Sequence, residues 1–284
     1  MRSFCTRRAS APPGPRDDGE AAATGVKAFS FGENWLRYSA RLDESHVREA
    51  EQSLQRLLRS EELGGAAFFD IGCGTGLFSI AAARLGVGEV LAVDLDEECV
   101  AAARHNVARF LDGSALRSIE IRPGDILHPD PAWRDRFEIV YAWGSLHHTG
   151  AMWQAVENAL GCCRPGGRVA LALYNRTALS LWWLRIKRLY HAAPAWVRVG
   201  MVATLWVTRV GGRLLRARPP LRAGRGMSVW YDAVDWLGGL PYEYASPEQV
   251  TGFVAKRGFR PTRVVSTRRS GCNEFVFTRT DCPA

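Results

Sequence analysis

Apolar residues along the chain form two kinds of pattern, short continuous runs and sets at helical spacing. Between residues 35 and 59 the apolar positions recur at loosely helical intervals, which predicts a first amphipathic helix. A continuous apolar run over residues 66–71 predicts a buried strand, and a helix follows over residues 77–85. The same pair recurs as a strand over residues 89–93 and a helix over residues 97–110.

This alternation continues to residue 174. The pattern predicts strands over residues 119–122 and 137–142, then a helix over residues 152–163 and a strand over residues 168–174. The segment Pro165-Gly166-Gly167 separates the last two elements. Strands that alternate with helices of about ten residues are typical of a doubly wound α/β fold, with a parallel sheet and helices on both faces.

After Asn175 the alternation stops for about seventy residues. Helical segments rich in tryptophan lead into a segment rich in Gly, Pro and Arg, which predicts a helical cap inserted at about residues 176–244. A helix over residues 247–257 and strands over residues 259–266 and 273–278 complete the pattern. The cap therefore falls between the fifth and sixth strands.

The N-terminal segment has a different composition. Residues 1–27 hold Arg, Ala, Pro and Gly but no apolar run, so we expect a flexible leader rather than a secretory signal, and one domain over residues 28–284. The best apolar stretch elsewhere, residues 199–208, is shorter than the ~18 residues of a spanning helix. The seven cysteines show no metal-ligand spacing, and their odd number favours a reducing compartment. These features predict a cytoplasmic protein without a metal site.

Positive charge is concentrated in one segment. Between Arg176 and Tyr231 there are eleven Lys or Arg and no Asp or Glu, and subtracting these eleven from the net charge of +8 leaves −3 for the rest of the chain. A nucleic-acid-binding surface is therefore not expected. The basic segment indicates an anionic or lipid-linked acceptor, or peripheral contact with an anionic membrane. Solvated arginines on a helical cap are the alternative.

A glycine-rich turn joins the first strand to its helix. Glycines at 72, 74 and 76 allow a ligand to approach the backbone closely and permit positive φ angles. A dinucleotide fingerprint would need a further glycine at position 77, where this chain has Leu77, so a nicotinamide-dependent oxidoreductase is disfavoured. Taken alone, such a turn also occurs in tight connections that bind nothing.

Two acidic residues follow the next strands. Asp94 lies at the end of the second strand, where a carboxylate can accept hydrogen bonds from both hydroxyls of a ribose. Its alternative role, as a helix N-cap, suits Asp96 better. After the third strand, Asp125 could accept from an adenine amino group and Ile126 could pack on the ring, although a lone Gly-Asp is a common turn.

The order of these motifs, with Arg164-Pro165-Gly166-Gly167 before the fifth strand, resembles the class I S-adenosylmethionine (SAM)-dependent methyltransferases over residues 69 to about 174. The resemblance implies a Rossmann-like, seven-stranded, mostly parallel sheet with an antiparallel last strand. It implies that Asp70 lies near the methionine amino group, that the glycines line SAM, and that Asp94 and Asp125 bind ribose and adenine. The resulting cofactor-binding residues are Asp70, Gly72, Cys73, Gly74, Gly76, Asp94, Leu95, Asp125, Ile126 and Trp143.

A narrower resemblance concerns the acceptor. Residues 143–150 are similar to the loop after the fourth strand in small-molecule methyltransferases of the ubiquinone-biosynthesis type. Residues 31–35, 225–228, 235–239 and 272–277 are similar to uncharacterised bacterial methyltransferases of glycan and natural-product biosynthesis. The resemblance implies O-methylation of a sugar, quinol-like or natural-product hydroxyl, and leaves nitrogen and carbon acceptors open.

His147 and His148 follow the fourth strand, whose end faces the cofactor in such folds. An imidazole with an ordinary pKa of ~6.5 could take a proton from an acceptor hydroxyl, and we favour His148 for this role. The alternative is a packed histidine bonded to the backbone. Alignment alone can also accelerate methyl transfer to an acceptor that is already nucleophilic.

A polar and aromatic cluster follows the basic segment and is the candidate acceptor-binding set. Its alternative interpretation is an ordinary cap packed on the sheet, with acids at its surface. A non-enzymatic binding module is a further alternative, disfavoured by the intact glycine turn and its two acids. The candidate residues are Asp232, Asp235, Trp236, Tyr242 and Glu243.

Overall fold

The computed structural model describes residues 39, 42–215, 217, 229–268 and 270–280. The expected leader and the similar segments at residues 31–35 and 225–228 lie outside this part of the chain. Seven strands form one sheet in the order β3-β2-β1-β4-β5-β7-β6. Their bounds are β1 Ala67–Ile71, β2 Glu89–Asp94, β3 Ile119–Pro123, β4 Phe137–Trp143, β5 Cys163–Tyr174, β6 Phe259–Val265 and β7 Cys272–Arg279.

The sheet has the predicted mixed topology. Strands β1 to β5 pair in parallel, whereas β7 pairs antiparallel with both β5 and β6. Strands β1, β2 and β4 are buried along almost their whole length, as expected for a sheet covered on both faces. The doubly wound α/β fold with an antiparallel last strand is therefore confirmed.

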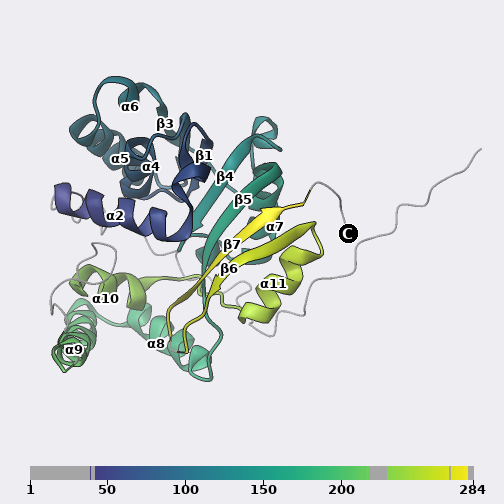
Figure 1. Cartoon of the computed structure of the whole chain (residues 1–284). Coiled ribbons are helices and arrows are strands. Elements are labelled where there is room, and N and C mark those ends of the chain that lie inside the picture. The colour runs from purple at the N-terminus through teal and green to yellow at the C-terminus, as the bar shows by residue number, and fades with distance from the viewer. Residues whose placement is uncertain (1–38, 40–41, 216, 218–228, 269, 281–284) are drawn as a thin grey trace, which may run out of the picture.

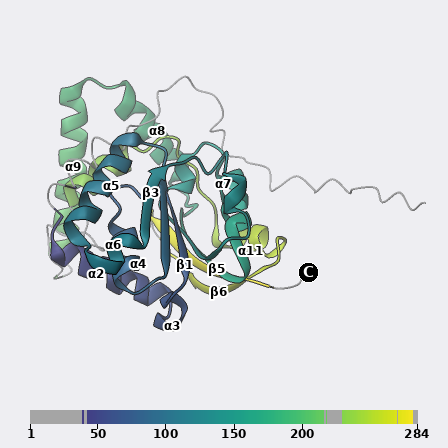
Figure 2. The ribbon, with the colours of Figure 1, turned by 90° about the horizontal axis from the view of Figure 1, so that it is seen from above.

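Helices cover both faces of the sheet (Figures 1 and 2). One core layer lies under α2 (Glu44–Leu57), α4 (Leu77–Arg84) and α5 (Glu97–Phe110). The other lies under α7 (Met152–Cys162) and α11 (Pro247–Ala255). The remaining short elements are α3 Ser60–Leu63, α6 Gly113–Arg117, η1 Pro131–Trp133 and η2 Leu146–His148.

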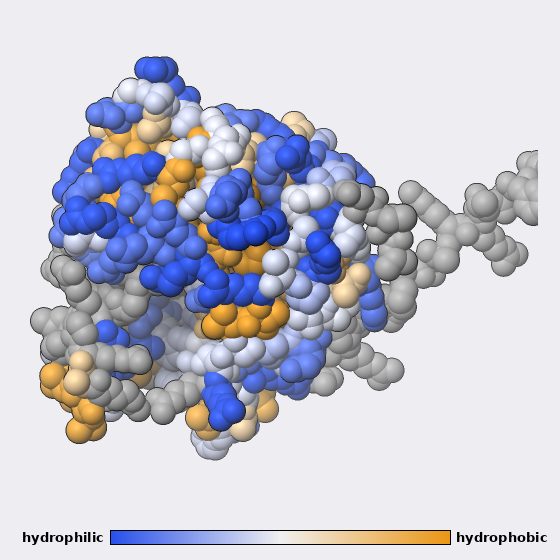
Figure 3. Space-filling model, in the orientation of Figure 1, coloured by the Kyte–Doolittle hydropathy of each residue, from blue (hydrophilic) through white to orange (hydrophobic). Residues whose placement is uncertain are grey.

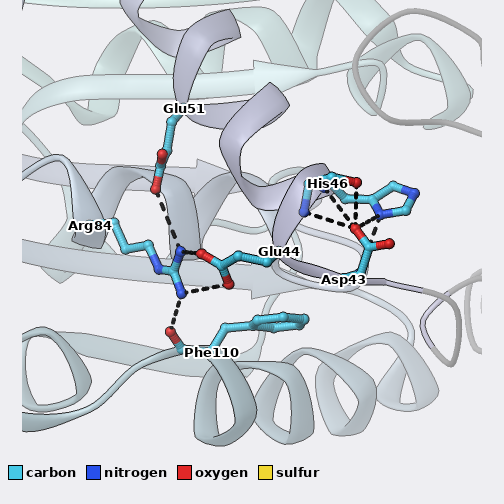
Figure 4. Close-up of polar contacts among 7 residues, drawn as sticks. Asp43, Glu44, His46, Glu51, Arg84 and Phe110 are labelled. Atoms are coloured by element: carbon cyan, nitrogen blue, oxygen red, sulfur yellow. Dashed lines mark hydrogen bonds and ion pairs between the residues drawn. The ribbon is translucent and has the colours of Figure 1, made fainter.

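Helix α2 begins at Glu44 because Asp43 caps it, and residues 35–38 of the predicted helix lie outside the described part of the chain. The Asp43 carboxylate accepts from the backbone N–H groups of Ser45 and His46 at 2.8 and 3.3 Å (Figure 4). Arg84 of α4 then ties α2 to α4 and α5 on the same face of the sheet. Its guanidinium pairs with Glu44 and donates to the Phe110 carbonyl at the end of α5. The first described helix is thus fixed on the sheet by charge as well as by packing.

The boundary between α7 and β5 also differs from the prediction. We expected Pro165 to Gly167 to separate a helix from a strand, yet β5 already begins at Cys163 and includes this segment. Its pairing with β4 shifts register between Phe137 and Ile139. A Cβ atom on Gly167 would lie 2.8 Å from the Cys163 sulfur and 2.9 Å from two carbonyl oxygens. The glycine therefore serves a close approach inside the strand, and does not mark its start.

The insertion after β5 is helical, as predicted, and consists in the described residues of α8 (Ser180–Ala192), α9 (Ala195–Leu214) and α10 (Val229–Gly238). It leaves and rejoins the sheet at one point, because Asn175 and Ala245 form a parallel bridge. The cap lies at the carboxyl ends of the parallel strands (Figure 1). Within the described part of the chain, no helix is both long and apolar enough to cross a bilayer.

Candidate cofactor and acceptor site

The turn after β1 can be built only from glycine at its key positions. Gly72, Gly74 and Gly76 have φ angles of 70°, 55° and 76°, which residues other than glycine rarely adopt. A Cβ atom on Gly72 would lie 2.3 Å from the Ser145 Cβ. The Gly72 N–H donates to the Val93 carbonyl at 2.8 Å. The turn is thus held between β2 and the loop after β4, with bare backbone available to a ligand.

Asp94 connects this turn to the start of α5. One carboxylate oxygen accepts the Gly74 N–H at 2.8 Å, and the other accepts the Asp96 N–H at 3.0 Å. Burial raises the pKa of Asp94 above its ordinary value. Asp96 caps α5 by accepting from the Glu98 N–H at 2.9 Å, as expected. The role of N-cap of α5 therefore belongs to Asp96 and does not explain Asp94. Leu95, the neighbour of Asp94, is 74% exposed at the same edge.

Asp70 is buried directly beneath the turn. The Ser79 hydroxyl donates to its carboxylate at 2.5 Å. Burial, with a smaller contribution from the charge of Asp94, raises the pKa of Asp70 to about 7. Among the described residues neither Asp70 nor Asp94 forms an ion pair. Asp70 and Asp94 thus lie beside a glycine backbone and have no positively charged partner among the described residues. This arrangement fits a positively charged ligand such as SAM.

The segment after β3 lies next to Asp94, because the Gly124 N–H donates to the Asp94 carbonyl at 3.0 Å. The Asp125 carboxylate accepts the Leu127 N–H at 2.8 Å and lies 2.8 Å from His128 Nδ1. Ile126 is buried in the core against the sheet. The structure thus brings Asp125 to the predicted edge, while the Ile126 side chain contributes to the core.

The other two predicted cofactor residues are Cys73, within the turn, and Trp143, at the end of β4. Cys73 is partly buried, and burial raises the pKa of its thiol well above the ordinary value, so the thiol is unreactive. Trp143, at the end of β4, stacks on Tyr141 with ring centroids 5.9 Å apart. Both residues are at the carboxyl edge where the resemblance places SAM.

The loop after β4 joins the turn to a second group of residues. Ser145 donates to the Ile71 carbonyl at 2.8 Å, and η2 then carries the two histidines. His147 is 1% exposed, and its ring centroid lies 3.8 Å from that of Tyr174 at the end of β5. Burial lowers the pKa of His147 well below its ordinary value. Among the described residues its Nδ1 has no hydrogen-bond partner.

His148 is a neutral imidazole in this setting. Burial, followed by the positive charge of Lys187, lowers the pKa of His148 to about 3. Its Nδ1 donates to the Pro241 carbonyl at 2.7 Å, so the lone pair lies on Nε2. The expected titration near neutral pH is thus shifted far downward. His148 can accept a hydrogen bond at pH 7 but is a weak proton acceptor.

Lys187 is a functional candidate that the sequence analysis missed. It is completely buried on α8, with its Nζ 4.8 Å from the Tyr242 ring centroid, 5.2 Å from Trp236 and 5.8 Å from Tyr174. It donates a hydrogen bond to the Trp236 carbonyl. Burial lowers the pKa of Lys187 to about 7. We had grouped it with the basic surface, although helical spacing places it with buried Ser180 and Tyr190.

The predicted acceptor residues separate into two groups. Trp236 and Tyr242 lie in the same cluster as Tyr174, Lys187 and the histidines, and Trp236 Nε1 has no hydrogen-bond partner among the described residues. We refer to these six residues as the cap cluster. The charge of Asp235 partly offsets the lowering of the Lys187 pKa by burial, and in this way Asp235 acts on the cap cluster.

Asp232 and Glu243 have other partners. Asp232 pairs with Arg209 of α9. The buried Glu243 carboxylate accepts the Met152 N–H at 3.0 Å and so caps α7, while the Glu243 N–H donates to the His147 carbonyl at 3.1 Å. Glu243 therefore connects the loop that carries His147 and His148 to the N-terminus of α7.

Comparison with known proteins agrees with this geometry. Residues 68–167 match the family model described as a methyltransferase domain. The chain is 32% identical over 133 residues to the ubiquinone biosynthesis O-methyltransferase of Bradyrhizobium diazoefficiens, covering 46% of this chain and 49% of that protein. It is 34% identical over 119 residues to the ribosomal protein L11 methyltransferase of Xylella fastidiosa, covering 42% and 35%. The chain thus spans less than half the length of these curated relatives.

Solved structures extend the likeness to the whole fold. Magnesium protoporphyrin IX methyltransferase of Synechocystis with bound SAH superposes with a TM-score of 0.53 at 17% identity, covering 88% of each chain. A SAM-dependent methyltransferase of Mesorhizobium loti gives 0.51 at 21% identity, covering 81% of this chain and 98% of that one. Residues 68–167 thus match a methyltransferase domain in sequence. The chain as a whole has the fold of the class I SAM-dependent methyltransferases.

Replacing Asp94 by alanine should weaken SAM binding by ~1–3 kcal/mol, because a charged hydrogen-bond acceptor is lost. Isothermal titration calorimetry measures the change. Asp96→Ala is the matched control, since it removes a carboxylate two residues away and costs α5 its cap but keeps the Asp94 carboxylate. Unchanged SAM affinity in a folded Asp94→Ala protein would exclude Asp94 from the cofactor site.

Asp70→Asn should make the stability of the SAM-free protein less dependent on pH. The pKa of Asp70 is about 7 in the fold and 3.8 in the reference state, so the folded protein holds a proton that the unfolded chain releases. Wild-type stability from this group therefore falls as pH rises from about 4 to about 7. The variant should melt at a higher temperature than wild type at pH 8, with a difference that shrinks toward pH 4.

The same Asp70→Asn protein should bind SAM at least ~10-fold more weakly at pH 8, since it cannot present a negative charge to the cationic ligand. Asp112→Asn, at an exposed position before α6, is the control for both measurements. Equal melting profiles for Asp70→Asn and wild type would show that Asp70 is not held as a costly buried acid.

Lys187→Met should test the buried charge. The pKa of Lys187 is about 7 in the fold against 10.5 ordinarily, so its cost is complete below pH 7 and vanishes above about 10.5. The variant loses the donor to the Trp236 carbonyl at every pH. Its stability relative to wild type should therefore improve by on the order of 1–4 kcal/mol as pH falls from 10 to 7. Denaturant titrations at both pH values measure this, with exposed Lys256→Met as the unaffected control.

Proposed function

We propose that the protein transfers a methyl group from SAM to a hydroxyl of a small molecule held by the cap cluster. The observation that carries this proposal is the joining of two half-sites at one edge of the sheet. The glycine turn with Asp70 and Asp94 is one half, and the cap cluster is the other. Ser145 links them, because its hydroxyl bonds the end of β1 while its chain continues into the histidine pair.

The chain's own residues suit the charge of this cofactor. SAM supplies a methyl group on a cationic sulfonium, so transfer is a displacement by a nucleophilic atom of the acceptor. Asp70 and Asp94 offer negative charge at the turn without a described counter-ion, and the positive-φ glycines leave the backbone open there. Their contribution is binding and alignment, which can supply much of the acceleration of a displacement reaction.

The acceptor half has the polarity that a hydroxyl requires. His147 is neutral and bonds the backbone at Ala172, so its unpartnered Nδ1 offers a lone pair. The indole Nε1–H of Trp236 offers a proton. A hydroxyl both donates and accepts, and can therefore pair with either buried atom. The rings of Tyr174, Trp236 and Tyr242 surround this region and favour a ring-bearing acceptor, such as a quinol-like or sugar ring.

The comparisons support the two halves unequally. The likenesses to the L11 methyltransferase and to the ubiquinone biosynthesis O-methyltransferase cover 42% and 46% of this chain, and both support the cofactor half. The likeness to a ubiquinone biosynthesis O-methyltransferase favours a small-molecule oxygen acceptor. Nitrogen or carbon of a natural product is the alternative acceptor atom. His148, with its lone pair on Nε2, is the group we favour for orienting the acceptor hydroxyl by accepting its hydrogen bond, since a pKa of about 3 makes it a weak base.

The proposal is tested by supplying tritiated SAM and metabolites extracted from cells that lack the gene. Label should move into a metabolite that accumulates in those cells and is absent from wild-type cells. Mass spectrometry should find the product heavier than this metabolite by about 14 Da, the mass that a methyl group adds when it replaces hydrogen. Calorimetry should show binding of SAM and none of NAD(H). Binding of NAD(H) alone, or SAM binding without any labelled product, would refute the methyltransferase proposal.

His148→Ala should reduce this methyl transfer by up to ~10²-fold with SAM affinity nearly unchanged, if the Nε2 lone pair aligns the acceptor hydroxyl by accepting its hydrogen bond. The measurement is initial rate of label transfer beside the thermal midpoint of the variant. A parallel loss of rate and thermal stability would instead support a packing role through the Pro241 hydrogen bond. Wild-type rate and stability would place the alignment of the acceptor elsewhere.

A further inference from the structure

The outer face of α8 combines large apolar side chains with arginines. Leu181, Trp182 and Leu189 are 57%, 60% and 59% exposed, and they lie on one side of the helix with exposed Arg185 and Arg188. The Arg185 guanidinium lies 5.3 Å from the Trp182 ring centroid. The opposite side carries Lys187 and enters the cap cluster. Helix α8 thus carries apolar side chains on its solvent-facing side as well as on the side that packs against the cap cluster.

Helix α9 is even less covered. Of its 20 residues only Val202 is buried. Trp196, Val199, Val207 and Leu214 are 78%, 60%, 59% and 59% exposed, and intervals of 3, 8 and 7 residues align them as one stripe. Arg209 lies on the other side of the helix, where it pairs with Asp232 of α10. The apolar stripe therefore runs along the outside of the molecule.

Figure 3 shows apolar side chains reaching the lower edge of the molecule, over the positions of α9 and α8 in Figure 1. These two helices supply nine of the fourteen large hydrophobic residues that are exposed in the described chain, counting Leu179 and Leu215 at their ends. Contiguous exposed apolar surface of this kind marks a surface that contacts something apolar.

Charge identifies what that contact is. The segment from residue 176 to residue 231 contains eleven basic residues and no acid. Arg185 and Arg188 are exposed on the outer face of α8, beside its apolar side chains. A second copy of the chain would bring the same positive charge against itself. An anionic lipid bilayer instead offers acyl chains for the apolar stripe and negative headgroups for the arginines.

We propose that α8 and α9 dock the protein on the surface of an anionic lipid bilayer. The exposed Trp, Leu and Val side chains lie at the boundary of headgroups and acyl chains, and the arginines extend to the phosphates. The contact is peripheral, because no helix in the described residues is long and apolar enough to span. It is independent of the methyl-transfer proposal, although α8 links the two by carrying Lys187 on its inner side and Trp182 on its outer side.

The test is co-sedimentation of the full chain with sucrose-loaded vesicles at 50 mM salt. We expect binding to vesicles of phosphatidylcholine with one quarter phosphatidylglycerol, and ~10-fold or weaker binding to phosphatidylcholine alone. Binding to the anionic vesicles should fall steeply at 500 mM salt, where charges are screened within a few ångströms. No sedimentation with anionic vesicles at low salt would overturn the proposal.

Two variants separate the apolar and ionic parts of the contact. Trp182→Ser/Trp196→Ser should lower the partition coefficient at least ~10-fold, and Arg185→Gln/Arg188→Gln should lower it by a similar factor and reduce its salt dependence. The matched control is Leu116→Ser/Arg117→Gln, which removes an exposed leucine and an exposed arginine from α6. SAM calorimetry confirms that each variant is folded.

Size-exclusion chromatography with light scattering separates docking from self-association. We expect a single monomeric species for wild type and for both variants in the absence of vesicles. A wild-type dimer that Trp182→Ser/Trp196→Ser converts to monomer would show that the stripe is covered by a second copy, and would overturn the proposal. Equal vesicle binding by wild type, both variants and the α6 control would do the same.

Discussion

The candidate site depends on a glycine turn whose backbone lies too close to its neighbours to leave room for side chains. The turn after β1 is enclosed by the Val93 carbonyl on one side and by Ser145 on the other, so a methyl group at Gly72 has no room. This contact fixes the distance between the end of β1 and the loop after β4. The same contact brings the buried acids of one half-site and the histidines of the other to neighbouring strands of the sheet.

Electrostatic cost is distributed in a consistent way around this turn. Asp70 and Asp94 are acids whose pKa values burial raises, and Lys187 is a base whose pKa burial lowers. Each group is kept in a setting that penalises its charge, which folding alone would not favour. Asp70 and Lys187 titrate near neutral pH, where a charged ligand can change their protonation. Such groups concentrate at sites that bind or react.

The strand and helix order could be predicted because apolar runs and helical spacing are local properties. The glycine turn was recognisable from its own motif, whereas the antiparallel last strand was implied by the resemblance to the class I methyltransferases. The cap cluster could not be assembled in the same way, since Tyr174, Lys187 and Trp236 meet only through tertiary packing. Lys187 was missed because a count of charges does not show which side of a helix each charge occupies. Glu243 had no local signal for capping α7, whose N-terminus is 91 residues away.

The cap leaves the sheet at Asn175 and returns at Ala245, and these two residues are bridged to each other. Asn175 is held from the far side as well, by Asn273 at 3.0 Å and by the Thr267 carbonyl at 2.7 Å. The scaffold is thus closed before the cap begins, and joining its two ends demands no rearrangement of the strands. A segment attached in this way can change length or sequence as an exchangeable module, so one α/β core can be fitted with different caps over the course of evolution.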